Sequence, residues 1–180
     1  MQTHAAFLRG VNLGSKRKAS GADLRAALEG AGFDDVATFR NSGNVVFTGK
    51  GPAPKLTEQV EACIAGKLGF DVKVYLRTAK EVRAVAERSP FPAEVVEASN
   101  GKLQVGFLDR KLSEGARKKV EALATGEDLL ATGPREVYWL PSGFMRDSTL
   151  DFKPLHAIAG ELTMRTMGTV ELMAAKFFAG

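Results

Sequence analysis

The sequence predicts a mixed α+β protein built from two tandem ferredoxin-like units, each with the element order βαββαβ. Three observations support this fold class. Short segments alternate apolar and polar residues, as half-buried strands do, and segments with helical spacing separate them. Two pairs of strands are each joined by turn-forming residues, which indicates hairpins. The same order of elements occurs twice along the 180 residues, which indicates a structural duplication even though the halves share few residue identities.

The first half begins with a strand and a helix. The segment Thr3–Val11 alternates apolar and polar side chains, as in a strand with one buried face. Ser20 followed by Asp23 is typical of a helix start, and Leu24 and Leu28 recur behind it at helical spacing. We therefore expect a strand, a loop that contains two glycines, and a helix.

A hairpin, a second helix and a fourth strand follow. Val36–Phe39 and Val45–Thr48 flank the stretch Asn41-Ser-Gly-Asn44, whose residues favour a tight turn. Apolar side chains recur at helical spacing over Lys55–Leu68, which predicts a helix. Val72–Arg77 alternates again. These elements complete the first predicted unit, over residues 1–78.

The second half repeats this order after a linking segment at residues 79–100. That segment has a helical pattern over Lys80–Arg88 and ends in the proline-containing loop Ser89–Pro92. The second unit is predicted over residues 101–180. Its expected elements are a strand over Leu103–Leu108, a helix from Leu112 to Leu123, a hairpin of Asp128–Ala131 and Glu136–Leu140 turned by Gly133-Pro134, a helix around Leu155–Ala159, a strand near Leu162–Arg165 and a closing helix over Thr169–Phe178.

Composition limits the classes of protein to be considered. The chain is 44% hydrophobic and 26% charged, which is enough apolar material for a core. No apolar run approaches the roughly 18 residues of a membrane helix, and the first residues lack the pattern of a secretion signal. We therefore expect a cytoplasmic protein without a membrane partner. The formal net charge of +4 permits an anionic partner without requiring one.

Residues suited to metal, redox or covalent chemistry are few. Cys63 is the one cysteine of the sequence, which excludes an internal disulfide and a thiolate zinc cluster. His4 and His156 have no metal-ligand spacing around them. We therefore expect no metal and no cofactor. No pair of acidic residues is marked as a general acid and base, so catalytic residues do not follow from the sequence.

Two first-half motifs, LRGVNLGSKRK from Leu8 to Lys18 and FRNSGNVVF from Phe39 to Phe47, resemble the opening and the hairpin of the bacterial proteins grouped as domain of unknown function 1697. In the second half, LPSGFMRDS and MRTMGTVELM resemble that family's glycine-arginine and closing segments less closely. The resemblance extends over the full length and implies a two-part α+β fold. It implies no activity.

The loop between the first strand and the first helix offers groups for an anion. Gly10 and Gly14 let a ligand approach the backbone closely, and the following helix start presents unpaired N–H groups. The spacing of the motif differs from a Walker A motif and from a dinucleotide fingerprint. A flexible loop with solvated charges explains the same residues, so both interpretations stay open. The candidate ligand-binding residues of this loop are Arg9, Asn12, Lys16 and Lys18.

The turn of the first hairpin supplies two further candidates, Ser42 and Asn44. The turn itself explains Asn41 and Gly43. The first and third strands of a βαββαβ unit are antiparallel neighbours, so the end of the first lies beside the start of the third. We therefore expect Asn12 and Asn44 to approach one another and the loop and the turn to form one pocket.

The sheet face that points away from the helices supports a different hypothesis. If Leu8 faces the helices, Phe7 and Arg9 face away from them, together with Tyr75 and Arg77. Aromatic rings beside arginines on this face are typical of RNA-recognition modules, although GNVVFT does not match their third-strand signature. A simpler alternative is that the two halves pack through these faces.

Three functional hypotheses result. The first, which we favour, is a site for a small phosphorylated or carboxylated ligand. The second is weak nucleic-acid binding through the sheet face and the basic loop. The third is an interaction protein in which the same motifs only stabilise the fold. The residues of the favoured site are Arg9, Asn12, Lys16, Lys18, Ser42 and Asn44.

Overall fold

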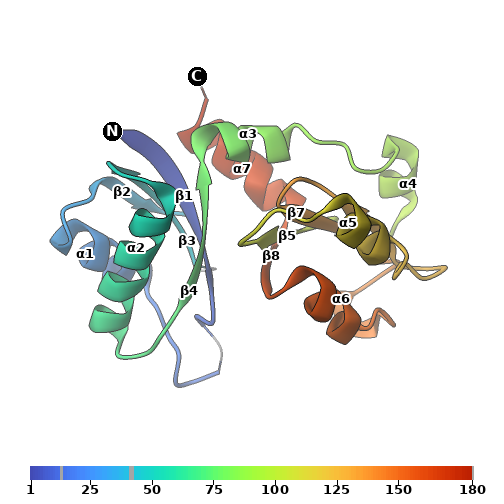
Figure 1. Ribbon diagram of the computed structural model, residues 1–180, viewed down its shortest axis with the longest axis horizontal. Coiled ribbons are helices and arrows are strands. Elements are labelled where there is room, and N and C mark those ends of the chain that lie inside the picture. Colours follow the sequence, from blue (N-terminus) through green and yellow to red (C-terminus); the bar gives the residue numbers. More distant parts are fainter. Residues whose placement is uncertain (13, 41–42, 180) are drawn as a thin grey trace. The chain divides into compact units, whose positions relative to one another are not determined.

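The chain is a mixed α+β protein with two four-stranded antiparallel sheets, which confirms the α+β part of the prediction. The computed structural model describes residues 1–12, 14–40 and 43–179 (Figure 1). Those residues include seven α-helices and one short 3-10 helix. The chain divides into two compact units, one of Met1–Ala84 with Met173–Gly180 and the other of Val85–Leu172.

The sheet of the first unit has the strand order β2-β3-β1-β4. Its central strand β1 is antiparallel to both β3 and β4, and Phe7 lies opposite Asn44 on one side and Tyr75 on the other. The end of β1 therefore lies beside the start of β3, as expected. The elements in chain order are β1 (Gln2–Arg9), α1 (Gly21–Gly30), β2 (Asp34–Thr38), β3 (Asn44–Gly49), α2 (Ala53–Leu68), β4 (Lys73–Thr78) and α3 (Ala79–Ala86).

Local signals start and end the two helices that cover this sheet. Ser20 is the N-cap of α1, because its hydroxyl oxygen accepts a hydrogen bond from the Asp23 N–H at 3.0 Å. Gly69 ends α2 in the left-handed conformation, with φ of 76°. Both helices lie on one face of the sheet (Figure 1).

The core of the first unit lies between α1, α2 and the helix-facing side of the sheet. Ala6 and Leu8 belong to this cluster, so Phe7 and Arg9 are on the other face, as the alternation of a strand predicts. The other buried residues of the cluster are Ala19, Leu24, Ala27, Leu28, Phe33, Val45, Phe47, Leu56, Val60, Ile64, Val72, Val74 and Leu76.

The sheet of the second unit has the strand order β6-β7-β5-β8. Here β5 is central and antiparallel to β7 and β8. The elements in chain order are α4 (Ala93–Ala98), β5 (Gln104–Leu108), α5 (Glu114–Glu121), β6 (Leu129–Thr132), β7 (Glu136–Leu140), the 3-10 helix η1 (Met145–Asp147), α6 (Phe152–Ala159), β8 (Leu162–Thr166) and α7 (Met167–Phe177), which from Met173 onward is assigned to the first unit.

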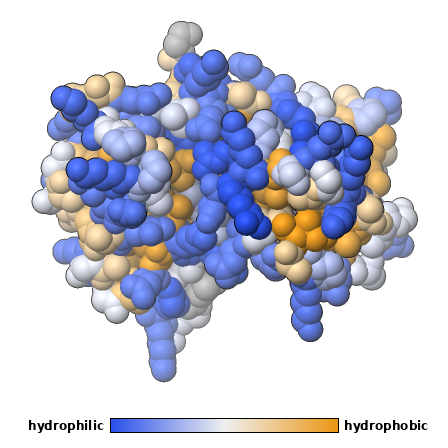
Figure 2. Space-filling model, in the orientation of Figure 1, coloured by the Kyte–Doolittle hydropathy of each residue, from blue (hydrophilic) through white to orange (hydrophobic). Residues whose placement is uncertain are grey.

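A buried carboxylate fixes the second unit's own core. Asp128 is 0% exposed. Its two oxygens accept hydrogen bonds from the Trp139 indole N–H at 3.1 Å and the Ser148 hydroxyl at 2.8 Å. These bonds tie the start of β6 to β7 and to the segment after η1. The apolar cluster around Trp139 combines strand residues with Val120 of α5 and Leu155 of α6. The face of the molecule drawn in Figure 2 is mostly hydrophilic, as expected when many of the apolar side chains are buried in such clusters.

Candidate functional site

The loop between β1 and α1 has a defined backbone. Gly10, Asn12 and Gly14 have φ values of 85°, 56° and 61°, a region that glycine and asparagine tolerate better than other residues. The Asn12 side-chain oxygen accepts a hydrogen bond from the Ala19 N–H at 3.1 Å, and the Asn12 N–H donates to the Arg17 carbonyl at 2.6 Å. Asn12 therefore braces the two ends of the loop.

Arg17 holds the same loop against the segment before β4. Its Nε donates to the Gly10 carbonyl at 2.7 Å, and its Nη2 donates to the Asp71 carbonyl. The guanidinium also lies 4.7 Å from the centroid of the Phe70 ring. A Cβ at Gly10 would lie 3.1 Å from Arg17 Nη2, so glycine leaves room for this arrangement. Two donor atoms of the Arg17 guanidinium are therefore used to hold the loop, while its positive charge remains in the wall formed by this segment.

Two hollows lie beside this loop. The first, which we call the Arg9 hollow, has a volume of about 400 Å³. The second, which we call the Lys18 hollow, has a volume of about 390 Å³ and includes the start of α1. The Arg9 hollow is lined by Arg9, Gly10, Arg17, Asp71, Val72 and Lys73, and the Lys18 hollow by Asn12, Gly14, Lys18, Ala19, Ser20 and Gly21.

The Arg9 hollow contains two cations from neighbouring strands. Arg9 ends β1 and lies directly opposite Lys73 at the start of β4. Residues opposite one another on antiparallel strands share a face of the sheet. The Lys73 ammonium lies 5.6 Å from the centroid of the Tyr75 ring on the same strand. Such a pair of cations is suited to an anionic group that contacts both.

The Lys18 hollow combines a lysine with a helix start. The first N–H groups of a helix attract anions, and Lys18 adds a full positive charge. An acid competes at the same helix end, because the Ser20 hydroxyl donates to an Asp23 carboxylate oxygen at 2.6 Å. Because Lys18 is its one basic lining residue, against Arg9, Arg17 and Lys73 in the other, the Lys18 hollow is less cationic than the Arg9 hollow.

The candidate residues from the sequence are placed in different surroundings. Arg9, Asn12 and Lys18 line the two hollows, whereas Lys16 is exposed and lines neither. Ser42 lies outside the described residues. Asn44 is 1% exposed, and its side-chain N–H donates to the Phe39 carbonyl at 3.1 Å, so it closes its own hairpin and lines neither hollow.

The loop and the hairpin turn meet at the same edge of the sheet. The Leu8 N–H donates to the Gly43 carbonyl at 2.8 Å. A Cβ at Gly43 would lie only 2.7 Å from Val11 Cγ2, so the turn packs directly against the start of the loop. The turn supports the loop through this backbone contact. The side-chain amides of Asn12 and Asn44, by contrast, form their hydrogen bonds within the loop and within the hairpin respectively.

Lys73 was not among the residues that the sequence analysis selected. It is the first residue of an alternating strand and shares the parity of Tyr75 and Arg77, which the sequence analysis placed on the face of Arg9. The alternation of the strand therefore predicts the face on which Lys73 lies. It does not predict that Lys73 lies opposite Arg9, because that register is set by pairing between distant segments.

The cysteine and the first histidine, whose side chains are suited to chemistry, form contacts within the fold. The Cys63 thiol donates to the Val60 carbonyl at 3.3 Å, and burial raises its pKa. His4 is 3% exposed and its ring stacks on Phe47 with centroids 5.6 Å apart. In the part of the chain that the structure describes, no three His, Cys, Asp or Glu side chains are grouped to hold a metal ion. Over the same ranges, no helix is both long and apolar enough to cross a membrane.

Charge is distributed unevenly between the two units. The first unit contains 14 Lys and Arg against 8 Asp and Glu, a formal net charge of +6. The second contains 11 Lys and Arg against 13 Asp and Glu, a formal net charge of −2. The two values add to the +4 of the whole chain. The excess of positive charge therefore belongs to the unit that contains the loop.

Comparisons with known proteins agree with the fold and name no activity. Residues 1–138 match the family described as protein of unknown function (DUF1697). The solved structure of the conserved bacterial protein SP0830 from Streptococcus pneumoniae is similar, with a TM-score of 0.73, 22% sequence identity and coverage of 97% of each chain. At this identity the likeness concerns the fold alone. No curated protein matches the sequence.

Proposed function

The chain belongs to the family of proteins of unknown function DUF1697, and from its own residues we propose that its first unit binds a small phosphorylated or carboxylated ligand at the loop between β1 and α1. One observation supports this most. The two hollows beside that loop are lined by four basic residues and one acidic residue, Asp71. The basic residues are Arg9, Arg17, Lys18 and Lys73.

The anionic group of the ligand is assigned to the Arg9 hollow. Arg9 and Lys73 lie opposite one another and both line this hollow, so one anionic group there can contact both. Arginine offers a planar pair of donors to a phosphate or carboxylate, and lysine offers a mobile point charge. The bracing of the loop by Arg17 and Asn12 keeps the wall of the hollow in place before a ligand arrives, which lowers the entropic cost of binding.

Thermal unfolding with and without anions tests this function. We expect inorganic phosphate, a nucleotide panel or citrate at millimolar concentration and constant ionic strength to raise the Tm of the parent. Losing a charge-assisted contact removes about 1.5–3 kcal/mol, which is about tenfold or more in affinity. Arg9→Ala and Lys73→Ala should therefore bind the anion at least about tenfold more weakly. Lys50→Ala is the matched control, because Lys50 is an exposed lysine of the same unit that lines neither hollow.

Two results would contradict the proposal. One is a parent whose Tm no anion shifts, and in that case the interaction-protein hypothesis replaces it. The other is an equal loss in Lys50→Ala, which would show that net charge and not the hollow attracts the anion. If Lys18→Ala alone abolishes the shift, the ligand lies in the Lys18 hollow on the other side of the same loop.

The nucleic-acid hypothesis receives less support. Base stacking needs accessible rings, whereas Phe7 is 0% and Tyr75 1% exposed. Weak binding through phosphate contacts alone would fall steeply as salt is added. A complex with single-stranded RNA that survives physiological salt and is lost in Phe7→Ala would reverse this ranking.

We infer further that each unit is a ferredoxin-like unit and that the two arose by duplication. Both have the element order βαββαβ and corresponding strand orders. Arg77 of β4 lies opposite Ala5 of the central strand β1, and Arg165 of β8 lies opposite Val105 of the central strand β5. Each arginine is followed by the threonine that ends its strand, Thr78 or Thr166. In both places the threonine hydroxyl oxygen accepts from an N–H three residues later, at 3.2 and 3.3 Å. The repeat therefore includes α3 and α7. The cytoplasmic location expected from the sequence stays a prediction.

A further inference from the structure

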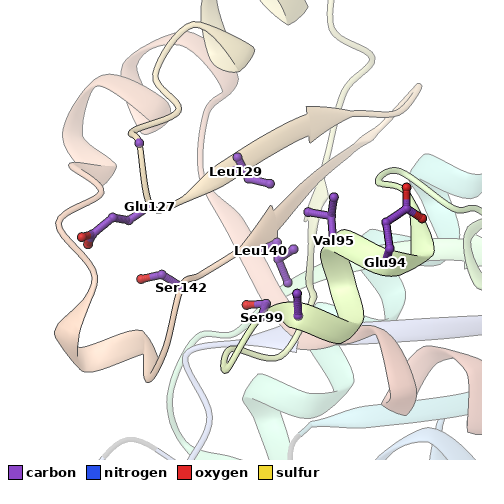
Figure 3. A pocket seen from close by; sticks show the side chains of 9 residues that line it. Glu94, Val95, Ser99, Glu127, Leu129, Leu140 and Ser142 are labelled. Atoms are coloured by element: carbon purple, nitrogen blue, oxygen red, sulfur yellow. The ribbon is translucent and has the colours of Figure 1, made fainter.

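A pocket of about 480 Å³ in the second unit has a composition opposite to that of the loop hollows. It lies between α4 and the strands β6 and β7. Figure 3 shows its floor, where Val95, Leu129 and Leu140 lie between two carboxylates, Glu127 at one end and Glu94 at the other. Leu129 and Leu140 are directly opposite one another across β6 and β7, so together they form a continuous apolar surface. None of the nine residues that line the pocket is a lysine or an arginine.

Hydrogen bonds fix α4 as one wall of this pocket. The Ser99 hydroxyl donates to the Pro141 carbonyl at 2.8 Å and accepts from the Gly101 N–H at 3.0 Å. A Cβ at Gly101 would collide with the Pro141 carbonyl oxygen, so the chain can pass here only as glycine. The end of α4 is therefore tied to the segment that follows β7.

The opposite end of the pocket is equally defined. The N–H groups of Glu127 and Asp128 donate to the Thr125 hydroxyl oxygen at 3.2 and 2.8 Å. Asp128 is buried and holds Trp139 and Ser148. The backbone of Glu127 is thus held in a hydrogen-bonded turn, while its side chain is exposed to solvent.

We propose that this pocket binds an aliphatic diamine, with the methylene chain on the apolar floor and one ammonium group at each of Glu94 and Glu127. Charge complementarity is the reason. The lining residues carry two carboxylates and no basic group, and the second unit has a formal net charge of −2. A ligand of this kind matches both features, because its ends are charged and its middle is apolar.

Other ligand classes fit the same lining less well. A divalent metal ion needs several oxygen ligands around one point, whereas here apolar side chains lie between the two carboxylates (Figure 3). An anion would meet two negative charges. A neutral diol would lie on the same floor without gaining either ion pair, which makes it the natural control ligand.

Chemical-shift titration of the isotope-labelled full chain tests the proposal. The probes are 1,4-diaminobutane, butylamine and 1,4-butanediol at constant ionic strength. We expect 1,4-diaminobutane to shift backbone amides in residues 94–101, 126–129 and 140–143 at millimolar concentration. Exposed ion pairs contribute about 0.2–1 kcal/mol each, which is up to about fivefold in affinity. Butylamine should therefore bind up to about fivefold more weakly, and the diol more weakly still.

Variants identify the two contacts. Glu94→Gln and Glu127→Gln should each weaken 1,4-diaminobutane by up to about fivefold and leave the diol unchanged. Glu97→Gln is the matched control, because Glu97 is an exposed glutamate of the same helix that does not line the pocket. The proposal is overturned if the diamine shifts no amides in these segments, if the diol binds as tightly as the diamine, or if Glu97→Gln weakens binding as much as Glu94→Gln. Because this site and the loop hollows share no residue, failure of one leaves the other standing.

Discussion

At the scale of single residues, His4 makes the stability of the first unit depend on pH. Burial lowers the pKa of the imidazole from 6.5, and the negative charge of Glu81 opposes this only in part. Within the described residues its Nδ1 has no hydrogen-bond partner. The unfolded chain therefore binds the proton first. The contribution of neutral His4 to the free energy of unfolding is therefore fully present above pH 6.5. It decreases as the pH falls from 6.5 to the pKa of the folded state, and below that pKa it decreases no further.

Replacing His4 by Phe should remove this pH dependence while keeping the ring stacked on Phe47. One proton contributes a slope of at most about 1.4 kcal/mol per pH unit. The free energy of unfolding is measured in urea between about pH 7.5 and 5.5, above the range in which carboxylates titrate. The prediction is contradicted if the free energy of unfolding of the parent does not change with pH in this range, or if His4→Phe keeps the pH dependence of the parent. Either result would show that protonation of His4 does not destabilise the folded chain.

Arg17 is the residue on which the loop most depends. Its guanidinium donates to two carbonyls of different segments and covers Phe70. Removing a charged donor of this kind costs about 1.5–3 kcal/mol, so Arg17→Ala should lower the free energy of unfolding by that amount. Arg17→Lys should recover little of it, because an ammonium cannot reproduce the planar fork. Urea unfolding measures both, and Lys16→Ala, an exposed neighbour, should change stability by less than about 0.5 kcal/mol.

At the scale of elements, substitutions at two glycines of the first unit distinguish the cost of backbone strain from the cost of disturbed packing. Gly14 and Gly43 both have positive φ, 61° and 69°. A Cβ at Gly14 meets nothing within 4 Å, whereas at Gly43 it would lie 2.7 Å from Val11 and 3.1 Å from Leu8. Gly14→Ala should therefore cost only the conformational penalty of about 1–2 kcal/mol. Gly43→Ala should cost about 1–3 kcal/mol more, because the turn must move away from the loop.

Equilibrium unfolding of both variants tests this difference. The expected order of stability is parent, Gly14→Ala, Gly43→Ala. Equal losses would mean that the turn and the loop do not pack against one another in solution. Ligand binding provides a second measurement, since a displaced turn should also weaken anion binding at the loop that it supports.

The elements that the sequence predicts correctly are those with a clear local signal. The alternating strands, those of both hairpins included, and the Ser20 cap are observed close to their predicted positions. The helix α4 was missed, because its six residues include no buried side chain and two prolines precede it. An amphipathic pattern needs a buried stripe to be visible. The pocket that α4 helps to form was missed for the same reason.

The candidate site shows a different limit. Glycine, asparagine and basic residues marked the loop, and the pairing of β1 with β3 brought the turn beside it. The sequence did not reveal that Asn12 and Asn44 are used to brace their own segments, nor that Lys73 lies opposite Arg9. These features depend on hydrogen-bond partners and strand register, which are set by the folded backbone and not by spacing along the chain.

At the scale of the whole molecule, a modest net charge conceals two units of opposite sign. The +6 of the first unit and the −2 of the second coincide with a loop lined by basic residues and a pocket lined by glutamates. Charge of this kind raises the local concentration of counter-ions and does not determine the fold. Phosphate and 1,4-diaminobutane should therefore bind to different units of the same chain.

A crossed titration of the full chain measures this separation. Phosphate should shift amides at residues 9–21 and 71–73, and 1,4-diaminobutane should shift those of the α4 pocket, with additive effects when both are present because the sites share no residue. Lys73→Ala should weaken phosphate alone and Glu94→Gln the diamine alone. Raising the salt to about 0.15 M, where charges are screened beyond about 8 Å, should weaken both ligands. If phosphate shifted the α4 pocket, or if each variant weakened both ligands equally, the asymmetry would act through net charge and neither site would be specific.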